Sequence, residues 1–452
     1  MRIMIVGVGK VGFTLAEHLT TEGHDVVVVD QSDAALRKCE DTLDVLCVSG
    51  NGAVAQTLQK GEIDHTDILI AATATDEINM LCCLIGKRLG AKYTIARIRD
   101  PQYNENLSLF EHELGIDLTI NPERATAIEI GRLLRLPFAS SVETFAHGLV
   151  EMVGFRAQIG DAFVGIPLKE VRNLNLPQVL YAAVERDGQA LIPNGDFVIE
   201  PSDHVFVIST PETISAFFRV LGKNTKPVKR AMILGGGRVS YYLARRITSG
   251  GTSVSLIEIN PDKARRLKED LSNVNVIQGD GTSQELLEQE GLRDMDAFIC
   301  LSDRDEENLM TGLFAIKQGV KKVVVKNNHI SYADIMNDLG LDNIVSPRQI
   351  TSSTILRYVR AVINSHGTKI DKLYRILGGK AEAMEFEARP GASYIGIPLH
   401  ALKKRPNTLV GMIVRKRKPI VPFGDDTIEA GDRVVILACE SGISDLNEVI
   451  SK

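Results

Sequence analysis

The stretch that decides the fold reads Ile5-Val6-Gly7-Val8-Gly9-Lys10-Val11-Gly12, with three glycines in the spacing GxGxxG. It follows an apolar run, opens a segment with helical spacing, and is followed by a strand-like run that ends in Asp30, 18 residues beyond Gly12. Gly7 permits a tight turn, Gly9 lets the backbone approach a pyrophosphate, and Gly12 allows close packing of helix on strand. This context predicts a Rossmann-type nucleotide site with the phosphates at a helix N-terminus.

The same pattern recurs in the second half of the chain. Residues 233–240 read ILGGGRVS, 228 positions beyond the first stretch, and Glu258 falls on Asp30 at that offset. The DEIN of 76–79 is matched by the DEEN of 305–308, and the GIPL of 165–168 recurs at 396–399, at offsets of 229 and 231. Offsets this steady over most of the chain indicate an internal duplication.

Within each half the sequence pattern changes once. Residues 1–122 alternate short β-branched runs with helical stretches, which is typical of a parallel sheet covered on both faces. A helical stretch at 123–134 then leads to a smaller segment of strands and turns, typical of antiparallel pairs. We therefore expect an α/β chain with two Rossmann-like, doubly wound parallel-sheet domains, each followed by a small α+β domain. The expected bounds are 1–139, 140–221, 230–366 and 367–452, with a polar, basic linker at 222–229.

Composition limits the classes of function. A chain of 452 residues with a net charge of -6 should form several soluble domains and offers no general attraction to nucleic acid. The six cysteines form no CxxC pair, so neither a metal clip nor a redox motif is expected. No apolar run of about 20 residues is present and a strand starts at once, so we expect a cytoplasmic protein whose membrane role is peripheral.

The candidate ligand residues lie where ligands of doubly wound sheets bind, at the carboxyl ends of the strands. Asp30 would accept hydrogen bonds from ribose hydroxyls and repel a 2′-phosphate, which favours NAD or an adenosine nucleotide over NADP. Glu258 can act likewise, but Ser240 replaces the third glycine and leaves the identity of the second ligand open. The other candidates in the first copy are Val8, Lys10, Val11, Asn51, Thr73, Ala74 and Arg97. In the second copy they are Gly235, Gly236, Gly237, Arg238, Val239, Asp280, Ser302 and Lys326.

Several of these positions allow two interpretations. Asn51 and Asp280 either contact adenine or ribose or close a turn, and Lys10 and Arg238 either meet a phosphate or remain solvated. Thr73 and Ser302 are candidates to bond the nucleotide, whereas Asp76 and Asp305 are alternatively simple helix N-caps. Arg97 and Lys326 end the fifth strand of each sheet, where a positive charge has a clear use.

In combination, both glycine loops, the loops at Asp76 and Asp305 and the paired GIPL turns resemble the regulator-of-potassium-conductance (RCK) family. The tandem form is similar to the cytosolic regulatory subunits of bacterial Trk potassium uptake systems. This resemblance implies a ring of such modules from a homotetramer, docked on the cytoplasmic face of a membrane-embedded Trk potassium channel subunit. It also implies that NAD(H), ATP or ADP binds in the two Rossmann-like domains and biases the ring between conformations, without catalysis.

Two other classes compete with a sensor. An NAD-dependent oxidoreductase would need a general acid–base group facing the nicotinamide, yet none of the nine histidines recurs at the repeat offset or sits in a catalytic motif. A scaffold with degenerate pockets conflicts with the intact first glycine loop. The basic runs RKRK (415–418), at a predicted hairpin, and KKR (403–405) are interpreted as solvated turns rather than lipid or partner contacts.

Overall fold

The computed structural model describes residues 1–104, 111, 113–223, 225–328, 336, 339–341, 343–363, 370–439, 442–443 and 445–451. The chain forms two compact units. One contains residues 1–126 and 346–359, and the other contains residues 127–345 and 360–452. Within the described part of the chain, no helix combines the length and the hydropathy needed to cross a bilayer.

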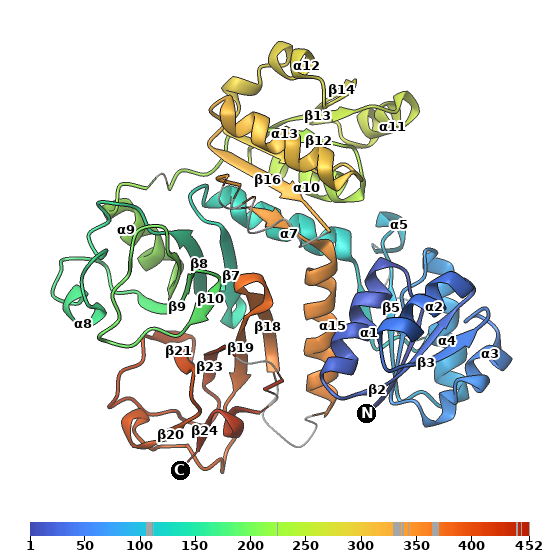
Figure 1. The fold of residues 1–452 in the computed structure, drawn as a ribbon, viewed down its shortest axis with the longest axis horizontal. Helices are drawn as coiled ribbons and strands as arrows, with labels where there is room; N and C mark the ends of the chain where they lie inside the picture. Colours follow the sequence, from blue (N-terminus) through green and yellow to red (C-terminus); the bar gives the residue numbers. More distant parts are fainter. Residues whose placement is uncertain are drawn as a thin grey trace. The chain divides into compact units, whose positions relative to one another are not determined.

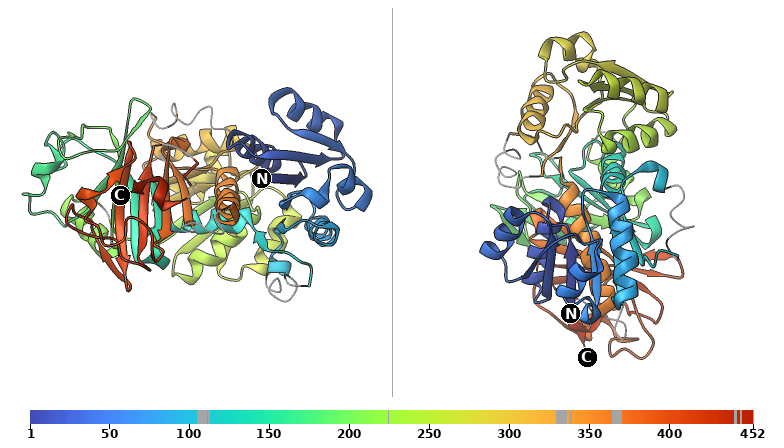
Figure 2. Two further views of the ribbon diagram at one scale, coloured as in Figure 1. Left: turned by 90° about the horizontal axis from the view of Figure 1, so that it is seen from below. Right: turned by 90° about the vertical axis from the view of Figure 1, so that its right-hand side faces the viewer.

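The first parallel sheet has the strand order β3-β2-β1-β4-β5-β6, which reverses between β1 and β4. The strands are β1 (Arg2–Val6), β2 (Asp25–Asp30), β3 (Leu46–Ser49), β4 (Ile68–Ala71), β5 (Tyr93–Arg97) and β6 (Leu118–Ile120). Helices lie on both faces of the sheet (Figure 1, Figure 2), namely α1 (Lys10–Thr21), α2 (Asp33–Thr42), α3 (Ala55–Lys60) and α4 (Asp76–Leu89). The central strands are almost wholly buried because both faces are covered, as their unbroken apolar runs predict.

The second parallel sheet repeats this order as β14-β13-β12-β15-β16-β17. Its strands are β12 (Arg230–Leu234), β13 (Ser253–Glu258), β14 (Val274–Gln278), β15 (Ala297–Cys300), β16 (Lys322–Lys326) and β17 (Ile344–Val345). Its helices are α10 (Arg238–Ser249), α11 (Pro261–Asp270), α12 (Gln284–Gln289) and α13 (Asp305–Lys317). In both sheets the order reverses beside a glycine loop, so the switch point lies at the candidate site.

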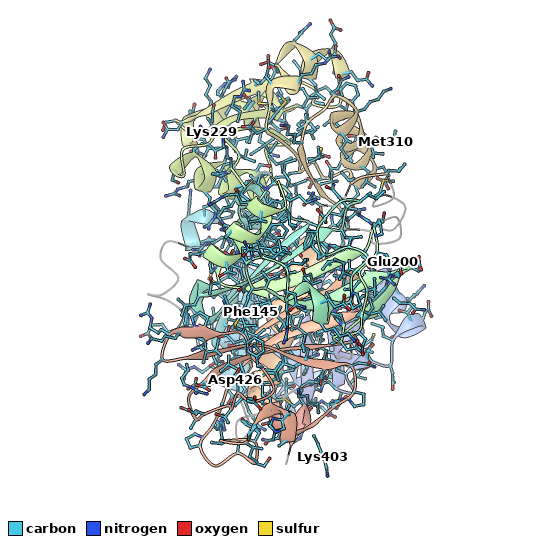
Figure 3. The ribbon with its side chains drawn as sticks, turned by 90° about the vertical axis from the view of Figure 1, so that its left-hand side faces the viewer. Phe145, Glu200, Lys229, Met310, Lys403 and Asp426 are labelled. Atoms are coloured by element: carbon cyan, nitrogen blue, oxygen red, sulfur yellow. The ribbon has the colours of Figure 1, made fainter. Side chains whose placement is uncertain are left out.

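Each parallel module is followed by a five-stranded antiparallel sheet. The first has the order β10-β9-β11-β8-β7, from β7 (Ser141–Phe145), β8 (Val150–Arg156), β9 (Leu180–Arg186), β10 (Gln189–Leu191) and β11 (His204–Ser209). The second has the order β18-β19-β23-β21-β22, from β18 (Ile370–Ile376), β19 (Ala381–Glu387), β21 (Thr408–Arg415), β22 (Lys418–Ile420) and β23 (Arg433–Ala438). The two sheets share one hydrophobic core, in which Phe145 lies (Figure 3). The predicted fold class is confirmed.

Two long helices connect parallel modules to antiparallel sheets, α7 (Pro122–Arg135) and α15 (Pro347–Ile363). The predicted helix at 123–134 is therefore confirmed as α7. A Cβ on Gly131 of α7 would lie 3.1 Å from Nε of Arg246 on α10, in the second parallel module. On α15, the hydroxyl of Ser352 lies 3.1 Å from Nδ1 of His18 in the first parallel module. Each connecting helix thus contacts the other half of the duplication, which the sequence did not indicate.

Candidate functional site

A pocket of about 510 Å³ lies at the carboxyl edge of the first parallel sheet, at its switch point. Its lining includes Gly7, Gly9, Lys10, Val11, Asp30, Asn51, Thr73, Ala74 and Arg97, all of them predicted from the sequence. Val8 lies in the glycine loop and Gly12 in the first turn of α1, and both are buried. The structure therefore brings most of the first-copy candidates together around one cavity of the size that small-molecule sites have.

The glycine loop has the geometry that the motif predicts. Gly7 has φ +92°, and a Cβ there would lie 2.8 Å from the backbone nitrogen of Thr73. A Cβ on Gly12 would lie 2.0 Å from the carbonyl oxygen of Gly7, which explains the close approach of α1 to the turn. Gly9 is the N-cap of α1 and provides no side-chain cap, so the first N–H groups of this helix face the pocket as donors for an anion.

Asp30 lines the pocket and also fixes the glycine loop through hydrogen bonds. Its Oδ2 accepts a hydrogen bond of 2.7 Å from the N–H of Val8, and its Oδ1 accepts one of 2.8 Å from the N–H of Ser32. An ionised carboxylate has about four acceptor positions, so both oxygens keep capacity for a pair of hydroxyls. Asn51 also lines the pocket, but its Oδ1 accepts from the N–H of Ala53 at 2.9 Å, so it closes a turn as well.

Two cations of the first copy lie at this pocket. Lys10 is exposed at the first turn of α1. Arg97, whose side chain is largely buried, ends β5 and lies 3.5 Å from Oε1 of Glu123. The hydroxyl of Thr73 donates to Oδ1 of Asn79 at 2.7 Å, so this hydroxyl already has a partner within the protein.

Sequence reasoning missed the part played by Asn79 and Asn308. Oδ1 of Asn79 accepts from the N–H of Thr73 at 2.8 Å, and its Nδ2 donates to the carbonyl of Arg97 at 2.8 Å. Asn308 joins Ser302 to the carbonyl of Lys326 in the same way, at 3.0 and 3.1 Å. Both amides are fully buried and tie the fourth strand to the fifth at the ligand edge. Their recurrence in the DEIN and DEEN segments was the available signal.

The N-cap interpretation of Asp76 and Asp305 is wrong. The N-caps of α4 and α13 are the preceding residues, neither of which makes a side-chain cap hydrogen bond. Oδ2 of Asp76 instead accepts from the N–H groups of Arg99 and Asp100, both at 2.8 Å, and Asp305 accepts from the N–H of Asn328 at 2.9 Å. Each aspartate fixes the chain where it leaves the fifth strand, because a buried carboxylate needs such donors.

The second glycine loop keeps the backbone geometry of the first. Gly235 has φ +92°, Gly237 is the N-cap of α10, and Arg238 is exposed at the first helical position, with Val239 buried behind it. Ser240 is fully buried and its hydroxyl donates to the carbonyl oxygen of Gly235. The hydroxyl that replaces the third glycine therefore closes the turn and does not face a ligand.

Three charged groups of the second copy, Glu258, Lys326 and Asp280, have partners within the protein. Glu258, 5% exposed, accepts from the N–H groups of Gly236 and Asn260 at 2.8 Å each and lies 3.3 Å from Nζ of Lys263. Nζ of Lys326 contacts Asp303 at 3.0 Å. Oδ1 of Asp280 accepts from the N–H and the hydroxyl of Thr282, and these bonds lower its pKa. Asp30 and Arg97 of the first copy have internal partners too, so the copies differ chiefly in the deeper burial of Glu258 and in the lysine beside it.

Comparison with known proteins agrees with this organisation. The family model described as the TrkA-N domain matches residues 3–122 and 231–347, and that described as the TrkA-C domain matches 152–222 and 383–451. Trk system potassium uptake protein TrkA homolog 1 of Methanosarcina mazei is 34% identical over 457 residues, covering 99% of both chains. Trk system potassium uptake protein TrkA of Vibrio alginolyticus is 35% identical over 446 residues, covering 96% of this chain and 95% of the relative.

Solved structures show the same fold at low sequence identity. The GsuK RCK domain superposes with a TM-score of 0.62 at 18% identity, over 97% of this chain and 92% of that one. The GsuK channel bound to NAD gives a TM-score of 0.64 at 18% identity, over 97% and 76% of the two chains. With matched domains in both halves and relatives of more than 30% identity over nearly its whole length, the chain belongs to the TrkA family of Trk system potassium uptake proteins.

Proposed function

We propose that this chain is the nucleotide-sensing regulatory subunit of a Trk-type potassium uptake system. The observation that carries the proposal is the pocket of about 510 Å³ in which the N-terminus of α1, Asp30 and Arg97 converge. The helix N-terminus and the arginine suit phosphates, and the carboxylate suits ribose hydroxyls. The TrkA relatives of similar length support the link to potassium uptake.

The proposed ligands of the first copy are NAD(H), ATP or ADP. Both oxygens of Asp30 already accept a backbone N–H, which holds the carboxylate in place and leaves lone pairs toward the cavity. A 2′-phosphate beside this carboxylate would be repelled, so NADP should bind worse than NAD. The GsuK channel, which has the same fold, has been solved bound to NAD, and this supports a nucleotide in such a pocket.

The full chain should therefore be titrated calorimetrically with NAD, NADH, ATP, ADP and NADP. Asp30→Asn should weaken binding, because an amide nitrogen would then face one of the two N–H donors that now bond the carboxylate. Glu258→Gln is the matched control in the second copy and should leave the first site unchanged. If none of the five nucleotides binds at millimolar concentration, the proposal that the chain senses nucleotides is refuted.

Regulation is proposed to act through a ring, a homotetramer docked on the cytoplasmic face of a membrane-embedded Trk potassium channel subunit. Its modules are proposed to span 1–139, 140–221, 230–366 and 367–452 with a linker at 222–229. A nucleotide changes gating only if it binds one ring conformation better than the other. Potassium uptake by cells that lack their own TrkA should recover with this chain and remain lower with Asp30→Asn.

The alternative of an NAD-dependent oxidoreductase is distinguished by turnover. The pocket lining contains no histidine, tyrosine or cysteine. Of its groups that could transfer a proton, Asp30 is held by two backbone N–H groups and Lys10 is exposed at the first turn of α1. Incubation with NAD and candidate alcohol or hydroxy-acid substrates should produce no reduced cofactor. Sustained formation of NADH would show that the chain is an enzyme and would contradict the proposal that it is a sensor.

A further inference from the structure

Equivalent hairpins of the two antiparallel sheets differ sharply in charge. The first joins β9 to β10, with Arg186 opposite Gln189 and a two-residue turn between them. The second joins β21 to β22, with Arg415 opposite Lys418 and the same turn length. The first hairpin tip, residues 187–189, reads DGQ, whereas the second hairpin tip, residues 416–418, reads KRK. The duplication has thus kept the turn and changed its charge from one negative to three positive.

The turn geometry makes the basic sequence an unusual choice. Asp187 and Gly188 have φ of 50° and 72°, and Lys416 and Arg417 have φ of 48° and 67°. Positive φ at both central positions is what two-residue hairpin turns of type I′ require, and Asp-Gly is among the sequences they prefer. Lysine and arginine enter this region of backbone conformation at a cost. The second hairpin tip therefore retains cations where conformational preference alone would not select them.

The base of each hairpin is held in the same way. Arg415 contacts Asp432 at 2.9 Å and Glu429 at 2.7 Å, and Arg186 makes the corresponding pairs with Asp203 and Glu200. Beyond this brace, Lys416, Arg417 and Lys418 are exposed, and none of the three forms an ion pair with a residue that the structure describes. The fold thus presents three uncompensated positive charges on a braced support.

In place of the solvated turn that the sequence alone favours for this run, we propose that the second hairpin tip binds anionic lipid headgroups at a membrane surface. The tip contains no apolar or aromatic side chain that could anchor it in a groove of a protein partner. Two of its three charges are lysine ammoniums, which act as hydrated point charges without fixed bonding geometry. Such charges suit a flat, diffuse anionic surface and give binding that weakens as salt is added. This contact is independent of the nucleotide site.

The chain supplies a charge-matched control. Lys403 and Lys404 are exposed and precede the start of β21. The side chain of Lys403 projects from the surface (Figure 3). The second hairpin tip follows the end of β21, an eight-residue strand that spans roughly 25 Å. Reversing the charges of Lys403 and Lys404 to glutamate changes the net charge by four, as much as replacing the second hairpin tip by the sequence of the first, and leaves the tip unaltered.

The test is cosedimentation of the full chain with phosphatidylglycerol-containing vesicles and with pure phosphatidylcholine vesicles, at low and high salt. The wild type should prefer the anionic vesicles and dissociate as salt rises. The variant Lys416→Asp/Arg417→Gly/Lys418→Gln, which carries the first tip, should lose on the order of a hundredfold in partitioning, at roughly fivefold per basic residue. The variant Lys403→Glu/Lys404→Glu, with the same change in net charge, should keep most of its binding.

Three results would overturn the proposal. One is equal binding of the wild type to anionic and neutral vesicles, as expected if the tip contacts an acidic protein surface instead. Another is an equal loss of partitioning in both variants, which would mean that net charge alone determines the binding. The third is unchanged partitioning of the variant with the first tip, whose thermal midpoint should not fall because Asp-Gly suits a type I′ turn.

Discussion

Replacing Glu382 by glutamine should destabilise the second antiparallel sheet severely. Glu382 and Arg360 are 1% and 2% exposed and form a bidentate pair at 2.9 and 3.1 Å. Nε of Arg375 lies 3.6 Å from the same carboxylate. Glu382→Gln leaves two guanidinium groups facing a neutral amide in the interior. Removing one partner of a buried ion pair costs about 3–5 kcal/mol, so a loss of that size is expected.

The first copy provides the matched control. Arg135 pairs there with Glu151, but the side chain of Arg135 is 43% exposed. Burial raises the pKa of Glu151, so its charge is already costly in the folded state. In Glu151→Gln the arginine can turn into water, and pairs with an exposed partner contribute about 1 kcal/mol or less. The two substitutions therefore remove the same chemical pair at very different expected cost.

Hydrogen–deuterium exchange measured by mass spectrometry separates the two sites, because it reports local free energies of opening. Peptides covering β19 should exchange faster in Glu382→Gln, and those covering β8 should change little in Glu151→Gln. Urea unfolding followed by circular dichroism gives the global effect, since the chain has no tryptophan to report by fluorescence. Equal losses in the two variants, or a loss below about 1 kcal/mol in Glu382→Gln, would refute the argument from burial.

Three further predictions concern single positions. Burial and the neighbouring Glu129 raise the pKa of Glu143 from 4.5 to about 8, with Arg132 and Lys372 opposing the shift. The folded state then retains a proton that the unfolded chain has lost, so stability should fall as pH rises from about 4.5 to about 8. Glu143→Gln should reduce this slope and raise stability above pH 8, measured as urea midpoints against pH, while Glu129, whose pKa burial raises to about 7, keeps a part of the slope; an unchanged slope contradicts it. Asn79→Ala should lower the free energy of unfolding by about 1–3 kcal/mol, because it leaves buried donors and acceptors unpaired. The loss should appear as faster amide hydrogen exchange at the end of β5, where Nδ2 of Asn79 bonds the carbonyl of Arg97. Gly7→Ala should cost more than the about 1–2 kcal/mol that positive φ alone costs, because a Cβ would also lie 2.8 Å from the backbone of Thr73. The thermal midpoint should therefore fall, and a midpoint equal to that of the wild type would disprove this.

Much of the first site was predictable because its chemistry is local. The GxGxxG spacing, the following strand and Asp30 lie within one βαβ unit, and most of the residues predicted from them line one cavity. The roles of Asn79 and Asp76 were less accessible. Their partners, Arg97 and Arg99, are separated from them by a helix and a strand, so only the folded chain brings them within hydrogen-bond distance.

By itself the sequence determined the duplication, the order of four modules and the position of both glycine loops, because periodicity and glycine spacing act over short stretches of chain. Only the tertiary structure decided which charges remain available. The burial of Glu258 beside Lys263 distinguishes the second loop from the first. The cation that ends the fifth strand is paired in both copies, Arg97 with Glu123 and Lys326 with Asp303. The contact of His18 with Ser352 joins positions 334 residues apart. Such contacts depend on how modules pack, which no local pattern encodes.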